Sequence, residues 1–84
     1  MVKVIMYTTQ HCSFCVRAKG LLRHKGVPFE EIDVSANDEL REKMIEASGR
    51  RTVPQIFIND RPIGGFEELQ ALDDQGELDR LLAA

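Results

Sequence analysis

The chain has 84 residues, which is enough for one small domain with a single core, so we expect residues 1–84 to form one domain. A hydrophobic content of 43% and a charged content of 30% argue against disorder, and a net charge of −3 argues against nucleic acid as a partner. No apolar run approaches the roughly 20 residues of a membrane span, and the first residues are too mixed for a secretory signal. We therefore expect a cytoplasmic protein without membrane partners.

The first half of the chain predicts two strands, each followed by a helix. Residues 2–7 are apolar and β-branched and predict a central strand. From Cys12 the apolar residues follow a helical period, which Gly26 ends. Residues 28–34 carry three acids and predict an edge strand, parallel to the first. A capping box at residues 35–38 predicts the start of a second helix, which ends at Gly49.

The second half predicts two antiparallel strands and a last helix. Residues 55–58 form an apolar run, residues 59–61 form a turn, and residues 62–63 return as a short strand. The Gly64-Gly65 pair breaks the chain before a helix that begins with Phe66. Its apolar stripe continues into a further turn with Leu78, Leu81 and Leu82. The expected order is βαβαββα, an α/β fold.

The chain has two cysteines, Cys12 and Cys15, separated by two residues. A zinc site needs four ligands, and only His11 and His24 stand near this pair in the sequence. A structural disulfide is a poor explanation, because a two-residue spacer closes almost no loop. A CxxC pair beside a βαβ pattern favours redox exchange.

Cys12 is the expected nucleophile because the first helix begins there. The thiolate is the reactive form, and a free cysteine with a pKa of about 8.5 is mostly protonated at neutral pH. A negative charge at a helix N-terminus gains up to about 2 kcal/mol, which corresponds to between one and two pKa units. We expect the amides of Phe14 and Cys15 to lower the pKa of Cys12 further. Cys15, deeper in the helix, is the expected resolving thiol.

Three motifs in this order resemble the glutaredoxins of the thioredoxin superfamily, and most of all the small bacterial dithiol class. They are the CxxC at the first helix, Thr52-Val53-Pro54 before the third strand, and Gly64-Gly65 before the last helix. The resemblance covers nearly the whole chain. It implies one glutaredoxin-like domain with the thioredoxin fold, a four-stranded mixed sheet covered by helices on both faces.

The same resemblance implies a glutathione-dependent thiol-disulfide oxidoreductase that reduces protein disulfides and glutathione mixed disulfides. Its partners would be glutathione, disulfide-containing or glutathionylated proteins and, indirectly, glutathione reductase, with NADPH as the electron source. Cys12 and Cys15 would be catalytic, and we expect a monomer. The implied glutathione contacts are Phe14, Arg41, Thr52, Val53, Pro54, Gly65, Phe66 and Glu67.

Several of these contacts have specific roles in the family. Pro54 would be cis and face the active cysteine, and the backbone of Val53 would pair with glutathione like an added strand. The amides of Phe66 and Glu67 would bind the γ-glutamyl carboxylate, and the Glu67 side chain would meet its ammonium group. From the residues alone, Pro54 could equally mark a sheet edge, and the segment around Phe66 could be an ordinary strand-to-helix turn.

This sequence departs from the family at both ends of glutathione, with Thr9 and Phe14 at the glycine end and Glu67 at the γ-glutamyl end. Thr9 replaces a lysine that is common upstream of the CxxC, Phe14 replaces a tyrosine, and Glu67 stands where aspartate is more frequent. Both polar contacts to the glycine carboxylate are therefore expected to be weaker. Arg41, or less directly Arg51, would take over this end, although a solvated surface charge explains either arginine as well.

Two alternative functions follow from the same resemblance. Ser13 replaces the usual proline between the cysteines, and some relatives with serine or glycine there hold a [2Fe-2S] cluster between two protomers through the first cysteine, here Cys12, and bound glutathione. The second alternative is a redoxin reduced by thioredoxin reductase. Such proteins usually carry a Trp-Ser-Gly-Phe segment near the last helix, and this chain contains no tryptophan.

Overall fold

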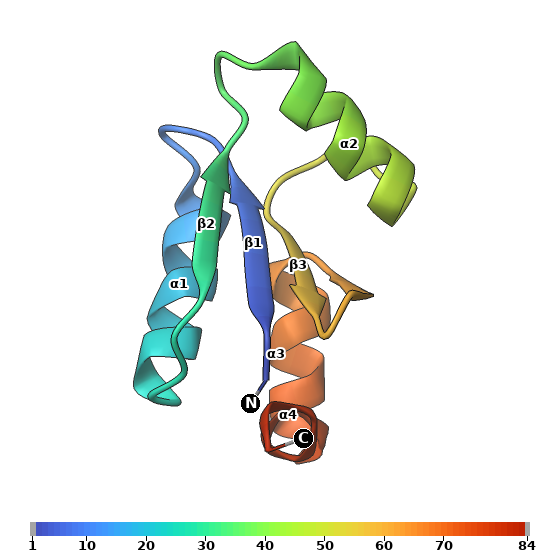
Figure 1. Cartoon of the computed structure of the whole chain (residues 1–84). Helices are drawn as coiled ribbons and strands as arrows, with labels where there is room; N and C mark the ends of the chain where they lie inside the picture. The colour runs from blue at the N-terminus through green and yellow to red at the C-terminus, as the bar shows by residue number, and fades with distance from the viewer. Residues whose placement is uncertain (1, 84) are drawn as a thin grey trace.

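Four strands and four helices follow one another along residues 2–83, the part of the chain that this computed structural model describes (Figure 1). In chain order they are β1 Val4–Thr8, α1 Ser13–His24, β2 Glu30–Asp33, α2 Asp38–Ser48, β3 Gln55–Ile58, β4 Arg61–Gly64, α3 Phe66–Asp74 and α4 Glu77–Leu82.

The strands form one mixed sheet in the order β2-β1-β3-β4. β1 runs parallel to β2, with Ile5 opposite Glu30, and antiparallel to β3, with Ile5 opposite Phe57. β3 and β4 pair antiparallel across the turn at Asn59 and Asp60. The central position of β1, the edge position of β2 and their parallel pairing confirm the topology expected from the sequence.

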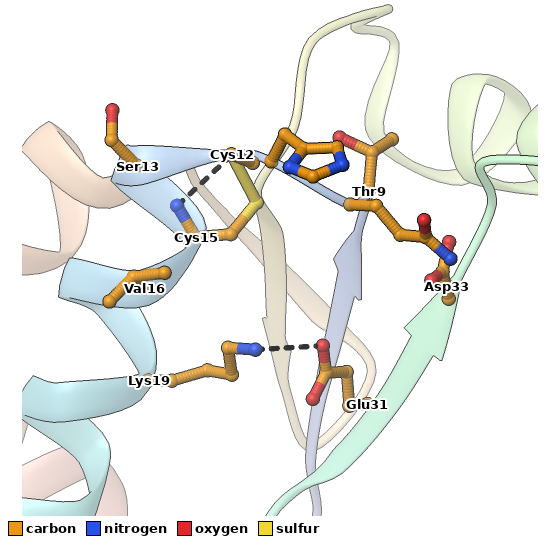
Figure 2. A pocket seen from close by; sticks show the side chains of 10 residues that line it. Thr9, Cys12, Ser13, Cys15, Val16, Lys19, Glu31 and Asp33 are labelled. Carbon is orange, nitrogen blue, oxygen red and sulfur yellow. Dashed lines mark hydrogen bonds and ion pairs between the residues drawn. A yellow bond between two sulfur atoms is a disulfide. The ribbon is translucent and has the colours of Figure 1, made fainter.

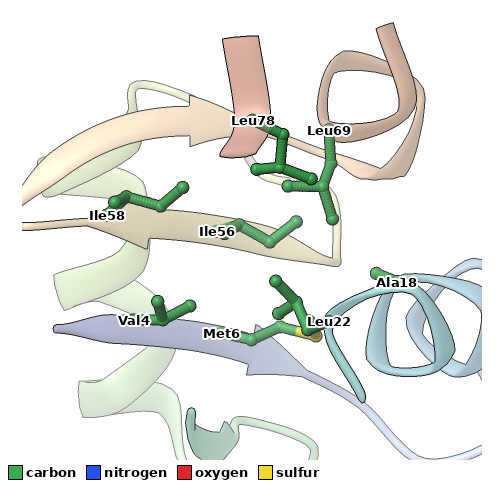
Figure 3. Close-up of a cluster of buried hydrophobic side chains, with 8 residues drawn as sticks. All are labelled: Val4, Met6, Ala18, Leu22, Ile56, Ile58, Leu69 and Leu78. Atoms are coloured by element: carbon green, nitrogen blue, oxygen red, sulfur yellow. The ribbon is translucent and has the colours of Figure 1, made fainter. Parts of the chain in front are cut away.

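One face of the sheet carries the main hydrophobic core (Figure 3). Alternate side chains of β1 and β3 point to this face, as the period of a strand requires, and meet buried residues of α1, α3 and α4. The members of this core are Val4, Met6, Ala18, Leu22, Ile56, Ile58, Leu69 and Leu78. The core therefore holds α1 and α3 side by side on one face of the sheet. In the view of Figure 1, both helices begin toward the upper part of the sheet.

The opposite face belongs to α2. The intervening residues of β1 and β3 point there, and the rings of Tyr7 and Phe57 meet edge to face at 5.7 Å. With Ile5 they line a cavity of about 410 Å³ that Ala47 of α2 also borders. Helices thus cover both faces of the sheet, as expected.

The start of α2 differs from the sequence-based expectation of a capping box at Ser35. The N-cap is Asn37, whose side-chain oxygen accepts a hydrogen bond from the Leu40 amide at 3.0 Å. Ser35 instead binds the loop before α1, because its hydroxyl accepts a hydrogen bond from the Gln10 amide at 2.8 Å. This tertiary contact takes the side chain away from the helix end.

The C-terminal region also differs from the expectation. Gly64 is the last residue of β4 and not a break after it. The further turn after α3 is a separate helix, α4, because Gly76 takes the left-handed conformation with φ 76°. Lys25, after the end of α1, forms ion pairs with Asp73 of α3 and Asp79 of α4. Hydrogen bonds to these carboxylates raise the pKa of Lys25.

Candidate active site

Cys12 is the N-cap of α1, with extended backbone angles of φ −107° and ψ 106°. Its sulfur accepts a hydrogen bond from the Cys15 amide at 3.1 Å, one of the donors that the first turn of a helix leaves free. The sequence led us to expect a second such bond from the Phe14 amide, and none is present. The two cysteines form a disulfide with a Cα–Cα distance of 5.2 Å (Figure 2).

The two sulfurs differ in their access to solvent. Cys15 is 1% exposed, whereas Cys12 is only half-buried, although both residues border the same surface pocket. His11, just before it, has a left-handed backbone with φ 59°, so the loop from β1 turns sharply before the helix begins. An attacking group or an incoming disulfide can therefore reach Cys12 and not Cys15.

The segment before β3 lies directly against Cys12. The Val53–Pro54 peptide bond is cis, and the carbonyl oxygen of Val53 lies 3.9 Å from the Cys12 sulfur. The buried side chain of Gln55 donates a hydrogen bond to the Thr52 carbonyl oxygen at 2.9 Å and holds this segment in place. Residues about 40 positions apart in the sequence thus meet at the reactive sulfur.

A groove of about 270 Å³ runs from this segment to the start of α3, and we call it the α3 groove. It contains every glutathione contact implied by the resemblance except Arg41. Arg41 lies in the first turns of α2, and Arg51, also outside the groove, is exposed. The lining residues are Phe14, Arg50, Thr52, Val53, Pro54, Gly65, Phe66, Glu67 and Glu68.

Aromatic side chains form the rim of the α3 groove near the cysteines. The rings of Phe14 and Phe66 lie 6.2 Å apart, and the Arg17 guanidinium lies 5.6 Å from the centre of the Phe14 ring. Phe14 is 47% exposed, and Val16, two residues farther along α1, is 65% exposed. Large apolar side chains are therefore exposed near Cys12, which suits contact with another molecule.

Arg50 and Glu68 line the groove but were not identified from the sequence. Glu68 accepts hydrogen bonds from the Gly65 amide at 2.6 Å and from the Arg50 guanidinium at 3.1 Å. The Gly65 bond and the Arg50 charge lower the pKa of Glu68. Glu68 lies three residues after the N-cap, at the position where a capping box places an acid. The sequence spacing could therefore have predicted its contact with the Gly65 amide. No sequence signal pairs Arg50 with α3.

A second pocket of about 440 Å³ lies on the other side of Cys12, between α1 and β2 (Figure 2). Thr9, predicted at a weakened glutathione contact, lines this pocket and not the α3 groove. On its floor Glu31 accepts hydrogen bonds from the Lys19 ammonium at 3.0 Å and from the buried Thr8 hydroxyl at 2.8 Å. These bonds lower the pKa of Glu31, with Lys19 the larger cause.

The lowered pKa of Glu31 predicts how the free energy of unfolding changes at acid pH. Because its folded-state pKa is depressed, the stabilisation is present above about pH 4.5 and is lost as the pH falls through the folded-state value. We expect wild type to lose at most about 1 kcal/mol more than Glu31→Gln between pH 6 and pH 3, since the side chain is 37% exposed. Urea unfolding at both values measures this, and an equal loss in the two proteins would contradict it.

Residues 2–83 contain neither a metal-binding cluster nor a membrane-spanning helix. No group of three or more His, Cys, Asp or Glu side chains within this range is arranged to hold a metal ion. Within the same range, none of the helices combines the length and the hydropathy needed to cross a membrane.

Comparison with known proteins gives a consistent set of matches. The model of the family described as "Glutaredoxin" matches residues 4–63. Glutaredoxin 3 of Escherichia coli (strain K12) is 52% identical over 82 residues, covering 98% of this chain and 99% of the relative. The solution structure of glutaredoxin from Brucella melitensis is 56% identical, with a TM-score of 0.86, covering 98% and 89%. The crystal structure of a buckwheat glutaredoxin–glutathione complex is 25% identical, with a TM-score of 0.90, covering 98% and 77%.

Proposed function

Because this chain belongs to the glutaredoxin family of thiol-disulfide oxidoreductases, we propose that it reduces protein disulfides and glutathione mixed disulfides with glutathione as co-substrate. The observation that carries this proposal is the α3 groove, which is lined by backbone and aromatic groups suited to a short peptide and whose Val53 carbonyl oxygen lies 3.9 Å from the Cys12 sulfur. The structural similarity to a buckwheat glutaredoxin in complex with glutathione supports the same ligand.

Each end of glutathione has a fitting surface in the α3 groove. The backbone of Val53, just before β3, pairs with the main chain of the cysteinyl residue, as in β-augmentation. The amides of Phe66 and Glu67 lie at the start of α3 and donate hydrogen bonds to the γ-glutamyl carboxylate, while the Glu67 side chain faces its ammonium group. At the glycine end Phe14 offers an apolar contact, and Arg41 reaches the carboxylate only if glutathione extends beyond the groove.

Two reaction sequences use the same nucleophile. With a glutathionylated protein, the Cys12 thiolate attacks the glutathionyl sulfur and displaces the protein thiolate. The thiolate of a free glutathione molecule then attacks the glutathionyl sulfur of the Cys12 mixed disulfide, which releases glutathione disulfide and the Cys12 thiolate. With a protein disulfide, Cys12 forms a mixed disulfide with the protein, and the Cys15 thiolate attacks Cys12 to release the reduced protein. Two glutathione molecules then reduce the Cys12–Cys15 disulfide.

The helix geometry gives Cys12 its role in both sequences. Its sulfur lies at the N-terminus of α1 and accepts a hydrogen bond from the Cys15 amide, and both features stabilise a thiolate relative to a thiol. Cys15 is buried within a bonding distance of Cys12, so it reacts with a sulfur already attached there and not with free substrates. The protein would act as a cytoplasmic monomer that receives electrons from NADPH through glutathione reductase.

Coupled assays with two reductases test the glutathione dependence. We expect reduction of a glutathionylated peptide with NADPH, glutathione and glutathione reductase, and no reduction when thioredoxin reductase replaces the last two components. Activity only with thioredoxin reductase would contradict the proposal and favour the redoxin alternative. Omitting this protein from each mixture gives the uncatalysed background.

The [2Fe-2S] alternative depends on Cys12 and Ser13. Thiolates suit iron–sulfur chemistry, but one chain offers only Cys12 at the surface, so the other ligands would come from glutathione and a second copy. No contact in the described residues favours this assembly over the monomer. Anaerobic purification with glutathione, followed by an absorption spectrum, checks it, and a colourless monomer counts against the cluster.

A further inference from the structure

Arg50 and Glu68 both line the α3 groove and contact each other. Arg50 lies in the segment after α2, and Glu68 lies in the first turn of α3, so their 3.1 Å contact joins this segment to the start of α3. Both side chains remain almost half exposed, at 47% and 45%. A pair this exposed contributes little to folding, and its position in the groove calls for another role.

The neighbouring glycines leave room for this pair. A Cβ atom on Gly64 would lie 2.8 Å from the Glu68 carboxylate oxygen and 3.1 Å from the Arg50 guanidinium. A Cβ atom on Gly65 would lie 3.3 Å from the same carboxylate oxygen. The two glycines therefore let Glu68 fold back over the chain and hold Arg50 against the start of α3.

The charges among the groove residues favour a role for Arg50 in binding a carboxylate. Glu67 and Glu68 supply two negative charges beside the α3 amides, and Arg50 is the only cation among the groove residues. The Gly65 amide is already bound to Glu68, which leaves the next amides of the first turn for a ligand. Arg50 uses one nitrogen for Glu68, and its remaining donors are available to a second carboxylate.

We propose that Arg50, positioned by Glu68, is a specificity-determining residue that selects substrates with a γ-glutamyl carboxylate. This inference rests on the proposed use of glutathione. The γ-glutamyl end is a zwitterion, and the α3 groove offers Arg50 to its carboxylate and Glu67 to its ammonium group. Removing Arg50 would leave the ligand carboxylate beside two acids with only backbone donors.

The test uses one peptide joined by a disulfide either to glutathione or to cysteinylglycine, which lacks the γ-glutamyl residue. We expect Arg50→Gln to raise KM for the glutathionyl peptide about 3- to 10-fold, as loss of one half-exposed charged contact predicts, with kcat unchanged. KM for the cysteinylglycyl peptide should not change. Arg50→Lys should recover part of the loss, because the charge remains without the planar fork.

Arg61→Gln is the matched control. It replaces Arg61, an exposed residue of β4 outside the α3 groove, and changes the net charge by the same amount as Arg50→Gln. We expect wild-type KM values for both peptides. Equal increases in Arg50→Gln and Arg61→Gln would mean a general charge effect and would overturn the proposal.

The role of Glu68 is tested by measuring Arg50→Gln in a Glu68→Gln background. If Glu68 positions Arg50, the effect of Arg50→Gln on the glutathionyl KM should shrink to less than about 2-fold there. An unchanged effect would overturn the positioning by Glu68. Wild type without any preference for the glutathionyl peptide would contradict the proposed function itself, whereas a preference of undiminished size in Arg50→Gln would overturn only this inference.

Discussion

Cys12→Ser will abolish both the reduction of protein disulfides and the removal of glutathione, whereas Cys15→Ser will lose only the first activity. The Cys12 side chain is partly exposed, and its sulfur accepts a hydrogen bond from the Cys15 amide. A hydroxyl in its place therefore removes the nucleophile of both reaction sequences. Cys15 is 1% exposed and acts only on a disulfide already formed at Cys12. Glutathione can replace it when the substrate is a glutathione mixed disulfide.

The measurement is NADPH oxidation coupled through glutathione reductase, with a glutathionylated peptide and a peptide disulfide as separate substrates. Ser13→Ala is the matched control, because this exposed hydroxyl lies between the cysteines and the mechanism does not use it. It should keep both activities. If Cys15→Ser is as inactive as Cys12→Ser toward the glutathionylated peptide, glutathione cannot resolve the Cys12 mixed disulfide and the proposed sequence is wrong.

Leu78→Ala will destabilise the whole domain although Leu78 lies in a helix of only six residues near the end of the chain. Its side chain is fully buried in the core formed by β1, β3, α1 and α3. Truncation removes apolar contacts and leaves a cavity, which costs about 2–5 kcal/mol in comparable cores. For a domain of this size such a loss is a large part of the total stability.

Urea unfolding monitored by circular dichroism measures this effect. Arg80→Ala is the control in the same helix, because Arg80 is exposed and pairs with Glu77 three residues away. We expect it to change the free energy of unfolding by about 0.5 kcal/mol or less. A Leu78→Ala effect as small as that of Arg80→Ala would mean that α4 adds nothing to the core.

Patterns short enough to lie within one element were readable from the sequence. The apolar run of β1, the helical period after Cys12 and the acidic edge strand each depend on neighbouring residues, and the structure confirms their order and pairing. The N-cap role of Cys12 also follows locally, because the helix begins where the apolar period begins. The cap of α2 was misplaced because Ser35 binds Gln10, a partner 25 residues away.

The sequence by itself determined the α/β order, the redox pair and, through the three motifs, the resemblance that the comparisons confirm as family membership. The tertiary structure alone decided which residues share the groove at Cys12. It brought Arg50 and Glu68 together and left Arg41 outside, because the segment that joins α2 to β3 passes the first turn of α3. Charges 18 residues apart, one in a loop and one in a helix, carry no common period, so their pairing becomes visible only in the folded chain.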